Sequence, residues 1–200
     1  MKRLPILLIY SRIPAGLAVM GLAVAQPSHF RVFIIALIIY GLVSDIADGI
    51  IARKMGISTE TIRRLDSSVD QVFWILVILS AIWLVPNFFK THWIWITILA
   101  ALEAAAYLLS YARFGKEVAT HAIASKIWTL SLFAMLIQLF AVGNAGWVYW
   151  LCIITGVISR CEIIAILILL KHWTNDVPSL YHAIQIRQGK TIRRSKWFNG

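Results

Sequence analysis

Four aspartates occur at helical spacing in one polar stretch of this chain, residues 44–71. Asp45 and Asp48 are three positions apart, and Asp66 and Asp70 are four apart, so each pair shares one face of a helix. A tight turn between the two helices would aim all four carboxylates at one point, where like charges need cations. Oxygen ligands without His or Cys select hard cations, so the pattern predicts a site for Mg²⁺, Mn²⁺ or Ca²⁺.

Small residues accompany the first pair of aspartates. If residues 30–53 form one helix, Gly49 and Ala52 lie on the same face as Asp45 and Asp48 and leave its backbone open to a bulky ligand. Arg53 follows at once and can pair with phosphate. A plainer alternative is a salt-bridged polar loop in which neighbouring arginines neutralise the aspartates.

The order of these residues resembles a family signature. Asp45-x-x-Asp48-Gly49-x-x-Ala52-Arg53 followed by Asp66-x-x-x-Asp70 is similar to the motif of the CDP-alcohol phosphatidyltransferases. Ile62 stands where that motif has a second glycine, which affects how closely a ligand or a helix can approach the turn.

The resemblance implies an activity and a set of roles. It implies transfer of a phosphatidyl group from CDP-diacylglycerol to the hydroxyl of a polar alcohol, with release of CMP, as in phosphatidylglycerophosphate or phosphatidylinositol phosphate synthases. Two divalent ions, Mg²⁺ or Mn²⁺, would lie on Asp45, Asp48 and Asp66, with Asp70 in reach of the ions and acting as general base. Gly49, Ala52 and Arg53 would form the nucleotide-facing wall.

Composition places the chain in a membrane. Of its 200 residues, 60% are hydrophobic and 14% are charged, and the mean hydropathy is +0.79, outside the range of soluble domains. The 19 Lys and Arg exceed the nine acidic residues, which in a membrane protein indicates positive cytoplasmic loops and affinity for anionic lipid. We expect no nucleic-acid partner. The expected partners are the bilayer, the CDP-linked donor and the alcohol, and a homodimer stays open.

Six apolar runs are long enough to span a bilayer. We therefore predict an all-α, polytopic integral membrane protein with six transmembrane helices and a juxtamembrane C-terminal helix. Residues 1–172 would form the catalytic domain and residues 173–200 a basic cytoplasmic tail. The predicted spans are residues 4–25, 32–52, 66–85, 94–111, 125–142 and 147–170, with a polar loop at 54–64 and a loop at 88–93.

Positive charge is distributed unevenly between the two ends of the predicted spans. The loops on the side of the motif carry most of the Lys and Arg, whereas the other side carries only Arg31 and Lys90. The positive-inside rule then places the aspartates and both termini in the cytoplasm, with the chain in the inner (plasma) membrane as a multi-pass protein.

Arg12 interrupts the first apolar run. The family often has a P-N-x-x-T-x-x-R entry here, which Pro5 and Arg12 match while Ile6 and Ile9 replace its polar members. Arg12 either contacts a phosphate of the donor or pairs with one of the aspartates, and the sequence leaves both open.

Three further basic residues, Arg113, Lys126 and Arg160, lie in or near the last three spans. The resemblance implies an acceptor pocket here, for an alcohol that often bears its own phosphate. The alternative is that Arg160 and Lys126 pair with Glu103, Glu117 or Glu162, although Glu162 is two positions from Arg160 and so faces elsewhere on a helix.

The short C-terminal helix is predicted from residue 176 to 188, with Asp176 as its cap. Leu180, Ala183, Ile184 and Arg187 share a face, which favours a helix lying on the membrane surface.

Two other functions fit parts of the pattern. A divalent-cation transporter or channel would use the aspartates as its ion site, but only Glu103 and Glu162 continue acidic character into the other spans. A catalytically silent lipid- or nucleotide-binding relative would explain Ile62.

Overall fold

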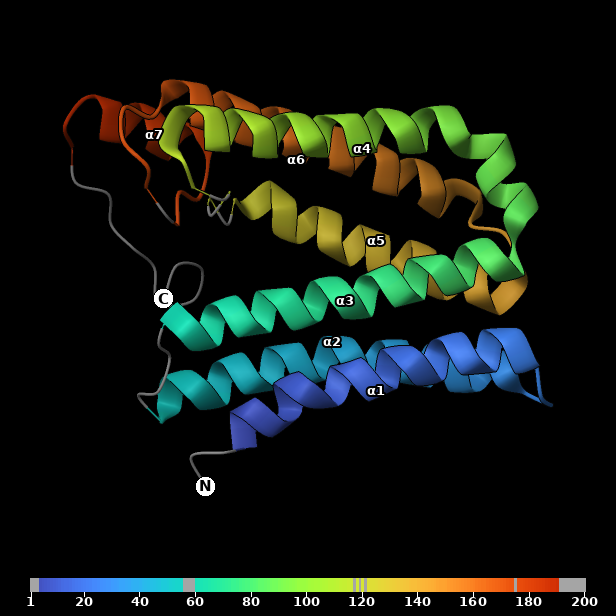
Figure 1. The fold of residues 1–200 in the computed structure, drawn as a ribbon. Helices are drawn as coiled ribbons and strands as arrows, with labels where there is room; N and C mark the ends of the chain where they lie inside the picture. Colours follow the sequence, from blue (N-terminus) through green and yellow to red (C-terminus); the bar gives the residue numbers. More distant parts are fainter. Residues whose placement is uncertain are drawn as a thin grey trace. The chain divides into compact units, whose positions relative to one another are not determined.

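The computed structural model describes residues 4–55, 60–116, 118, 120, 122–174 and 176–190, with the helical side chains of residues 53, 60, 61, 63, 64 and 67 left aside. Within these residues the chain is all-α (Figure 1). The helices are α1 Leu4–Ala25, α2 Phe30–Lys54, α3 Glu60–Leu84, α4 Pro86–Phe114, α5 Ile123–Val142, α6 Gly146–Leu169 and α7 Leu180–Arg187.

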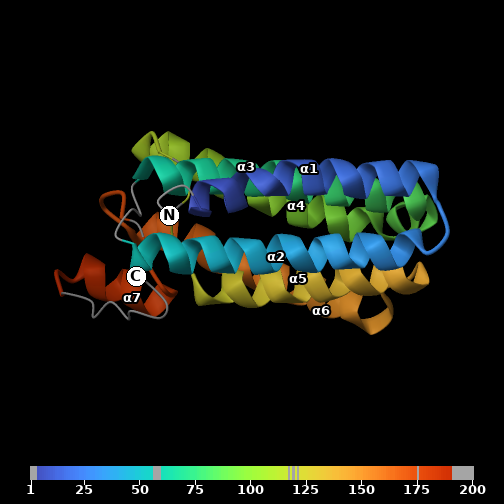
Figure 2. The same cartoon turned by 90° about the horizontal axis from the view of Figure 1, so that it is seen from below.

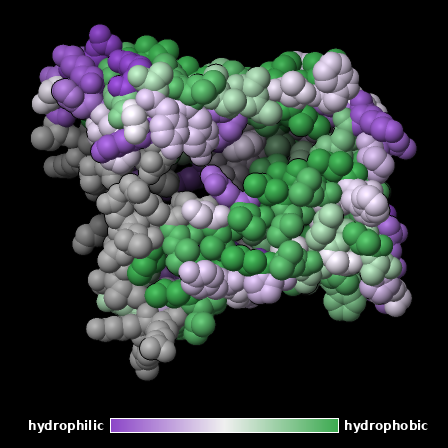
Figure 3. All heavy atoms as spheres, in the orientation of Figure 1, coloured by the Kyte–Doolittle hydropathy of each residue, from purple (hydrophilic) through white to green (hydrophobic). Residues whose placement is uncertain are grey.

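The helices are those of a multi-pass membrane protein. Five of them, α1, α2, α4, α5 and α6, are long and apolar enough to cross a bilayer, and α3 carries the shorter apolar segment Ser68–Leu84. Many large apolar side chains point outward, among them Leu7, Val32 and Phe33. Figure 3 shows how widely hydrophobic residues cover the described surface seen from one side. An exposed apolar surface of this extent suits lipid, because lipid tails need no polar covering.

The predicted spans agree closely with the helices where the apolar runs are long. The first span is α1 from end to end, and α2 is a single helix through the first half of the motif, as expected. The fifth and sixth spans lie within two residues of α5 and α6. Gly143, with φ +75°, makes the turn between them.

Two predicted loops were too long. α3 begins at Glu60, so the second part of the predicted loop 54–64 is helical, and residues 56–59 of that loop lie outside the described residues. The predicted loop 88–93 is also helical, because α4 begins at Pro86, directly after Val85. Proline is favoured in the first turn of a helix, where its missing N–H costs no hydrogen bond. Phe88 is buried there, which anchors this turn.

The chain forms two compact units, the first comprising residues 1–89 and 136–144. In this unit α1 packs against both α2 and α3 (Figure 1), and Figure 2 shows the same helices from below. The three run alternately up and down, so the start of α1, the end of α2 and the start of α3 share one end of the unit. The buried side of α1 is a stripe at helical spacing that includes Ile9, Arg12, Val19 and Ala23.

The second unit comprises residues 90–135 and 145–200. Its core joins α4, α6 and α7 through the following buried residues: Ala106, Ala122, Ile163, Ile166, Leu167, Leu170, Val177 and Ala183. The shared face predicted for α7 is therefore not a free membrane-binding face, since Ala183 is fully buried and Leu180 packs against this core. Ile184 remains exposed.

The predicted cap of α7 is wrong. Ser179 precedes the helix, and Asp176 adopts a positive φ of 55° three residues earlier. An Asx residue tolerates that left-handed conformation better than most others, so Asp176 serves the turn before α7. The backbone N–H of Leu180 is satisfied from outside, by Glu162 Oε1 of α6 at 3.1 Å.

Candidate functional site: a carboxylate cluster around Arg12

The four aspartates continue the buried stripes of two helices. On α2 the stripe runs through Ile34, Ile38 and Gly41 to Asp45 and Asp48. On α3 the positions Asp66, Asp70, Phe73 and Val77 follow the same spacing. Because α2 and α3 are antiparallel, both pairs of carboxylates lie at the same end of the first unit, as the sequence predicted.

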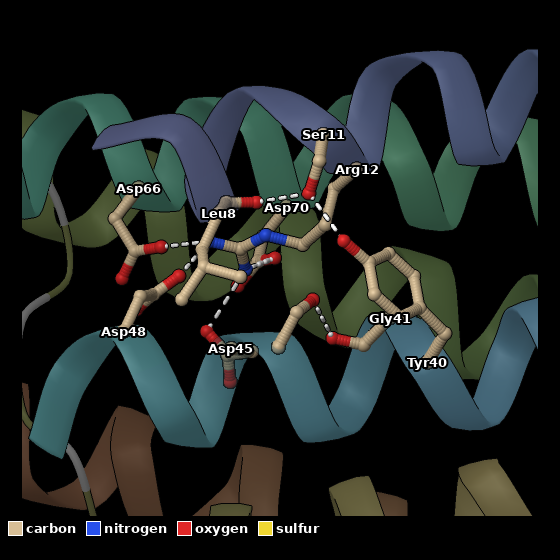
Figure 4. Close-up of polar contacts among 10 residues, drawn as sticks. Leu8, Ser11, Arg12, Tyr40, Gly41, Asp45, Asp48, Asp66 and Asp70 are labelled. Carbon is tan, nitrogen blue, oxygen red and sulfur yellow. Dashed lines mark hydrogen bonds and ion pairs between the residues drawn. The ribbon is translucent and has the colours of Figure 1, made fainter. Parts of the chain in front are cut away.

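Arg12 of α1 lies at the centre of the four carboxylates (Figure 4). Its Nη1 donates to Asp45 Oδ1 at 3.0 Å and to Asp70 Oδ1, and its Nη2 donates to Asp48 Oδ2 at 2.6 Å and to Asp66 Oδ1. The side chain thus contacts all four aspartates, where the sequence suggested one partner at most. A guanidinium presents its donors as a planar fork, which lets one residue bridge two helices.

Burial differs sharply within this cluster. The Arg12 side chain is 0% exposed and that of Asp48 is 2% exposed, whereas that of Asp45 is 38% exposed. Asp66 and Asp70 are intermediate. Asp45, Asp66 and Asp70 therefore form the more exposed side of the cluster, which we call its open side, whereas Arg12 and Asp48 are buried.

Three of the carboxylates satisfy the geometry of a cation site. Asp45, Asp48 and Asp66 each offer one oxygen, and these oxygens all lie within 4.8 Å of one another. Asp70 is not part of this group. The donor set is entirely carboxylate, which suits hard divalent cations such as Mg²⁺ and Mn²⁺. The residues therefore fit the metal that the motif implies.

Two glycines and a phenylalanine fix the spacing of the helices that carry the cluster. A Cβ atom on Gly41 would collide with the Phe73 ring, and one on Gly16 would lie 2.9 Å from Leu76 Cδ1. The Phe73 side chain is fully buried, one turn from Asp70. These residues were not predicted from the sequence, although small residues on membrane helices are the usual signal of close packing. A second link joins α1 to α2, where Ser11 Oγ and Tyr40 Oη are 2.6 Å apart.

The residues expected to face the nucleotide lie on the same helix as the first carboxylates. Ala52 is buried and Gly49 is half-buried on the last two turns of α2. The side chain of Arg53 lies outside the described residues. Ile62, which replaces the family glycine, is half-buried in the first turns of α3, one turn before Asp66.

A second polar cluster lies inside the second unit, around Arg160 of α6. Arg160 Nη1 is 2.7 Å from Glu103 Oε2 of α4, and the guanidinium carbon is 4.3 Å from the centroid of the Trp128 ring on α5. Gly156 makes room for this ring, since a Cβ there would be 2.7 Å from Trp128 Nε1. One of the ion pairs considered from the sequence, Arg160 with Glu103, is therefore formed.

The other two predicted acceptor residues have different surroundings. Arg113 donates from Nη1 to the carbonyls of Leu167 and Ile168, at 2.5 and 2.6 Å, and from Nη2 to that of Leu170 at 3.2 Å. It thus caps the C-terminal end of α6, where carbonyls lack helical partners. Lys126 is exposed in the first turn of α5.

Most of the sequence matches a known protein family. The family model described as CDP-alcohol phosphatidyltransferase matches residues 2–158, which include both halves of the motif. Searches of the curated proteins and of the solved structures found no match. The matched region is most of the chain and contains the carboxylate cluster in full. The chain therefore belongs to the CDP-alcohol phosphatidyltransferase family, whose members are phosphotransferases for substituted phosphate groups that act on CDP-alcohol substrates.

Proposed function

We propose that this protein transfers a phosphatidyl group from CDP-diacylglycerol to the hydroxyl of a polar alcohol and releases CMP. The observation that carries the proposal is the convergence of the four motif aspartates at one end of α1–α3 in a chain of this family. The apolar exterior supports a lipid donor, because its acyl chains can stay in the bilayer while its head group reaches the cluster.

Asp45, Asp48 and Asp66 would hold divalent ions, Mg²⁺ or Mn²⁺. The family resemblance also implies two ions, with Asp70 in reach of them. Ions bound there would neutralise charge on the pyrophosphate and on the leaving CMP. The three aspartates would hold the positive charge of the ions at the open side of the cluster. Gly49 and Ala52 lie on the adjoining turns of α2, and together with Arg53 they would form the wall for the nucleotide.

Asp70 is the proposed general base. It lies outside the three-carboxylate group and is partly exposed, so an oxygen of Asp70 can accept a proton from an alcohol at the open side. The alcohol oxygen would then form a bond to the phosphatidyl phosphorus as the bond from that phosphorus to the oxygen of CMP breaks. The proton moves from the hydroxyl to the Asp70 carboxylate, and the CMP leaves as an anion.

The acceptor is proposed to bind to basic residues of the second unit, Arg113, Lys126 and Arg160. Arg160 supports this role best, because it is buried beside an aromatic ring and its Nε has no hydrogen-bond partner among the described residues. Arg113 is already bonded to three carbonyls, which reserves most of its donors for the end of α6.

The test is an assay of purified protein with CDP-diacylglycerol and a panel of alcohols, with and without phosphate groups, in Mg²⁺, Mn²⁺ or EDTA. The proposal expects CMP release that depends on both an alcohol and a divalent ion, with a lipid product of matching mass. A protein that binds CDP-diacylglycerol but releases no CMP with any acceptor would be a silent relative.

A further inference from the structure

We infer that Arg12 is the resident cation of the carboxylate cluster and that a divalent ion binds there only by displacing its guanidinium. The inference rests on the proposed metal site and concerns what that site contains before the ion arrives.

Arg12 uses the same carboxylates that would hold the ion. Asp45, Asp48 and Asp66 form the three-oxygen group, and each of them accepts a hydrogen bond from an Arg12 terminal nitrogen. Figure 4 shows both terminal nitrogens pointing into the space that these side chains enclose.

The ion and the guanidinium cannot share this space. Mg²⁺ lies about 2.0–2.1 Å from its oxygen ligands. An ion held by Asp48 and Asp66 would lie close to Arg12 Nη2, which is 2.6 Å from Asp48 Oδ2 and also bonds Asp66. Two cations at that separation repel each other strongly in a buried site, so either the guanidinium or the ion is present.

Charge explains why Arg12 is needed and why it can be replaced. Four carboxylates in contact with a single guanidinium keep a large excess of negative charge. Without any cation the four would repel one another, and Arg12 limits that repulsion. A divalent ion neutralises more of the charge, and Arg12 gives up an incomplete set of contacts, because its buried Nε has no hydrogen-bond partner among the described residues.

The helix that carries Arg12 has a weak point beside it. Pro14 lies inside α1, two residues further on, and cannot donate a backbone hydrogen bond to the carbonyl of Tyr10. A missing bond in this turn lowers the cost of a local bend in a helix. Arg12 can therefore withdraw through a small change in α1.

The test measures Mn²⁺ affinity by electron paramagnetic resonance on the full-length protein in detergent. Arg12→Gln removes the competing charge and should bind Mn²⁺ about 10- to 100-fold more tightly than the wild type. Arg12→Lys should show a smaller gain, since one ammonium cannot hold four carboxylates in a fork. The control Arg31→Gln removes one positive charge from the same unit, where Arg31 bonds the carbonyl of Phe140, and should leave the affinity unchanged.

Equal or weaker Mn²⁺ binding in the Arg12 variants would overturn the inference, because Arg12 would then be holding the carboxylates ready for the ion. Should Arg12→Gln fail to fold, the affinity of Arg12→Lys decides in the same way. CMP release by the wild type separates the two proposals. Mn²⁺-dependent release with unchanged affinities rejects the displacement and leaves the transferase function standing, and no Mn²⁺ binding by any variant rejects both.

Discussion

Arg160 Nη1 lies 2.7 Å from Glu103 Oε2, so an ion pair joins α6 to α4 in the second unit. The proposed acceptor residue therefore already has an anionic partner. If Arg160 binds a phosphate on the acceptor, that phosphate would compete with Glu103 for the same guanidinium, and Glu103 would then lower the affinity for the acceptor.

We predict opposite effects for changes on the two sides of this pair. Arg160→Ala should raise the KM of a phosphate-bearing acceptor by about 10- to 150-fold, since a charge-assisted contact contributes about 1.5–3 kcal/mol. Glu103→Gln should lower that KM, because it frees the guanidinium. Steady-state kinetics with paired acceptors, with and without phosphate, check both. An equal loss with the phosphate-free acceptor would make Arg160 a packing residue.

Arg113 is predicted to act on stability more than on the acceptor. Arg113→Gln loses charged hydrogen bonds to three carbonyls at the end of α6, and we expect a loss of about 1–3 kcal/mol in the free energy of unfolding. The measurement is thermal or denaturant unfolding in detergent, together with acceptor KM. If the KM for the acceptor rises while the free energy of unfolding stays unchanged, Arg113 binds the acceptor phosphate instead.

Asp48 is predicted to be essential for turnover. It is the most buried of the four aspartates, and removing its carboxylate leaves the ion with one ligand fewer. Asp48→Asn should abolish CMP release while the protein still inserts and purifies. The matched control Asp176→Asn makes the same chemical change before α7 and should keep full activity. Near-normal release by Asp48→Asn would falsify the metal assignment.

The helices of this fold were predictable where a long apolar run marked them in the sequence. Long apolar runs predicted α1, α5 and α6 to within two residues, because a span needs a minimum length of continuous apolar sequence. The loop predicted at 88–93 was wrong, because Pro86 and the buried Phe88 start a helix there.

The convergence of the four aspartates was predictable from the sequence, whereas the position of Arg12 among all four was not. The spacing of Asp45, Asp48, Asp66 and Asp70 alone places them on matching faces of two successive helices. The position of Arg12 among all four depends on the rotation and depth of α1. In a membrane helix the lipid-facing and protein-facing sides are both apolar, so sequence alone does not fix that rotation.

Close packing near the cluster leads to a prediction for two glycines. A Cβ on Gly41 would collide with Phe73, so Gly41→Ala should push α2 from α3, cost about 1–3 kcal/mol of stability and weaken Mn²⁺ binding. Gly21 on α1 is the control, because a Cβ there meets nothing within 4 Å. Gly21→Ala should be neutral or stabilising by up to about 1 kcal/mol. Equal melting temperatures for the two variants would contradict the packing at Phe73.

The last prediction concerns the orientation of the chain in the membrane. The charge asymmetry of the sequence predicts that the carboxylate cluster faces the cytoplasm. Ser58, in the predicted cytoplasmic loop, lies outside the described residues, so we choose two exposed positions at opposite ends of α2. Lys54 ends this helix beside the cluster, and Ser28 lies in the turn before it. At a rise of about 1.5 Å per residue, α2 is longer than the roughly 30 Å hydrocarbon core, so the two positions lie on opposite sides of it.

Single cysteines at these positions should react differently with an impermeant thiol reagent. The native Cys152 and Cys161 are first replaced by serine, because Cys161 is exposed. In intact cells we expect labelling of Ser28→Cys alone, and labelling of Lys54→Cys only after the membrane is opened. The reverse pattern would place the carboxylates outside the cell, away from CDP-linked donors, and the proposed substrate could not reach them.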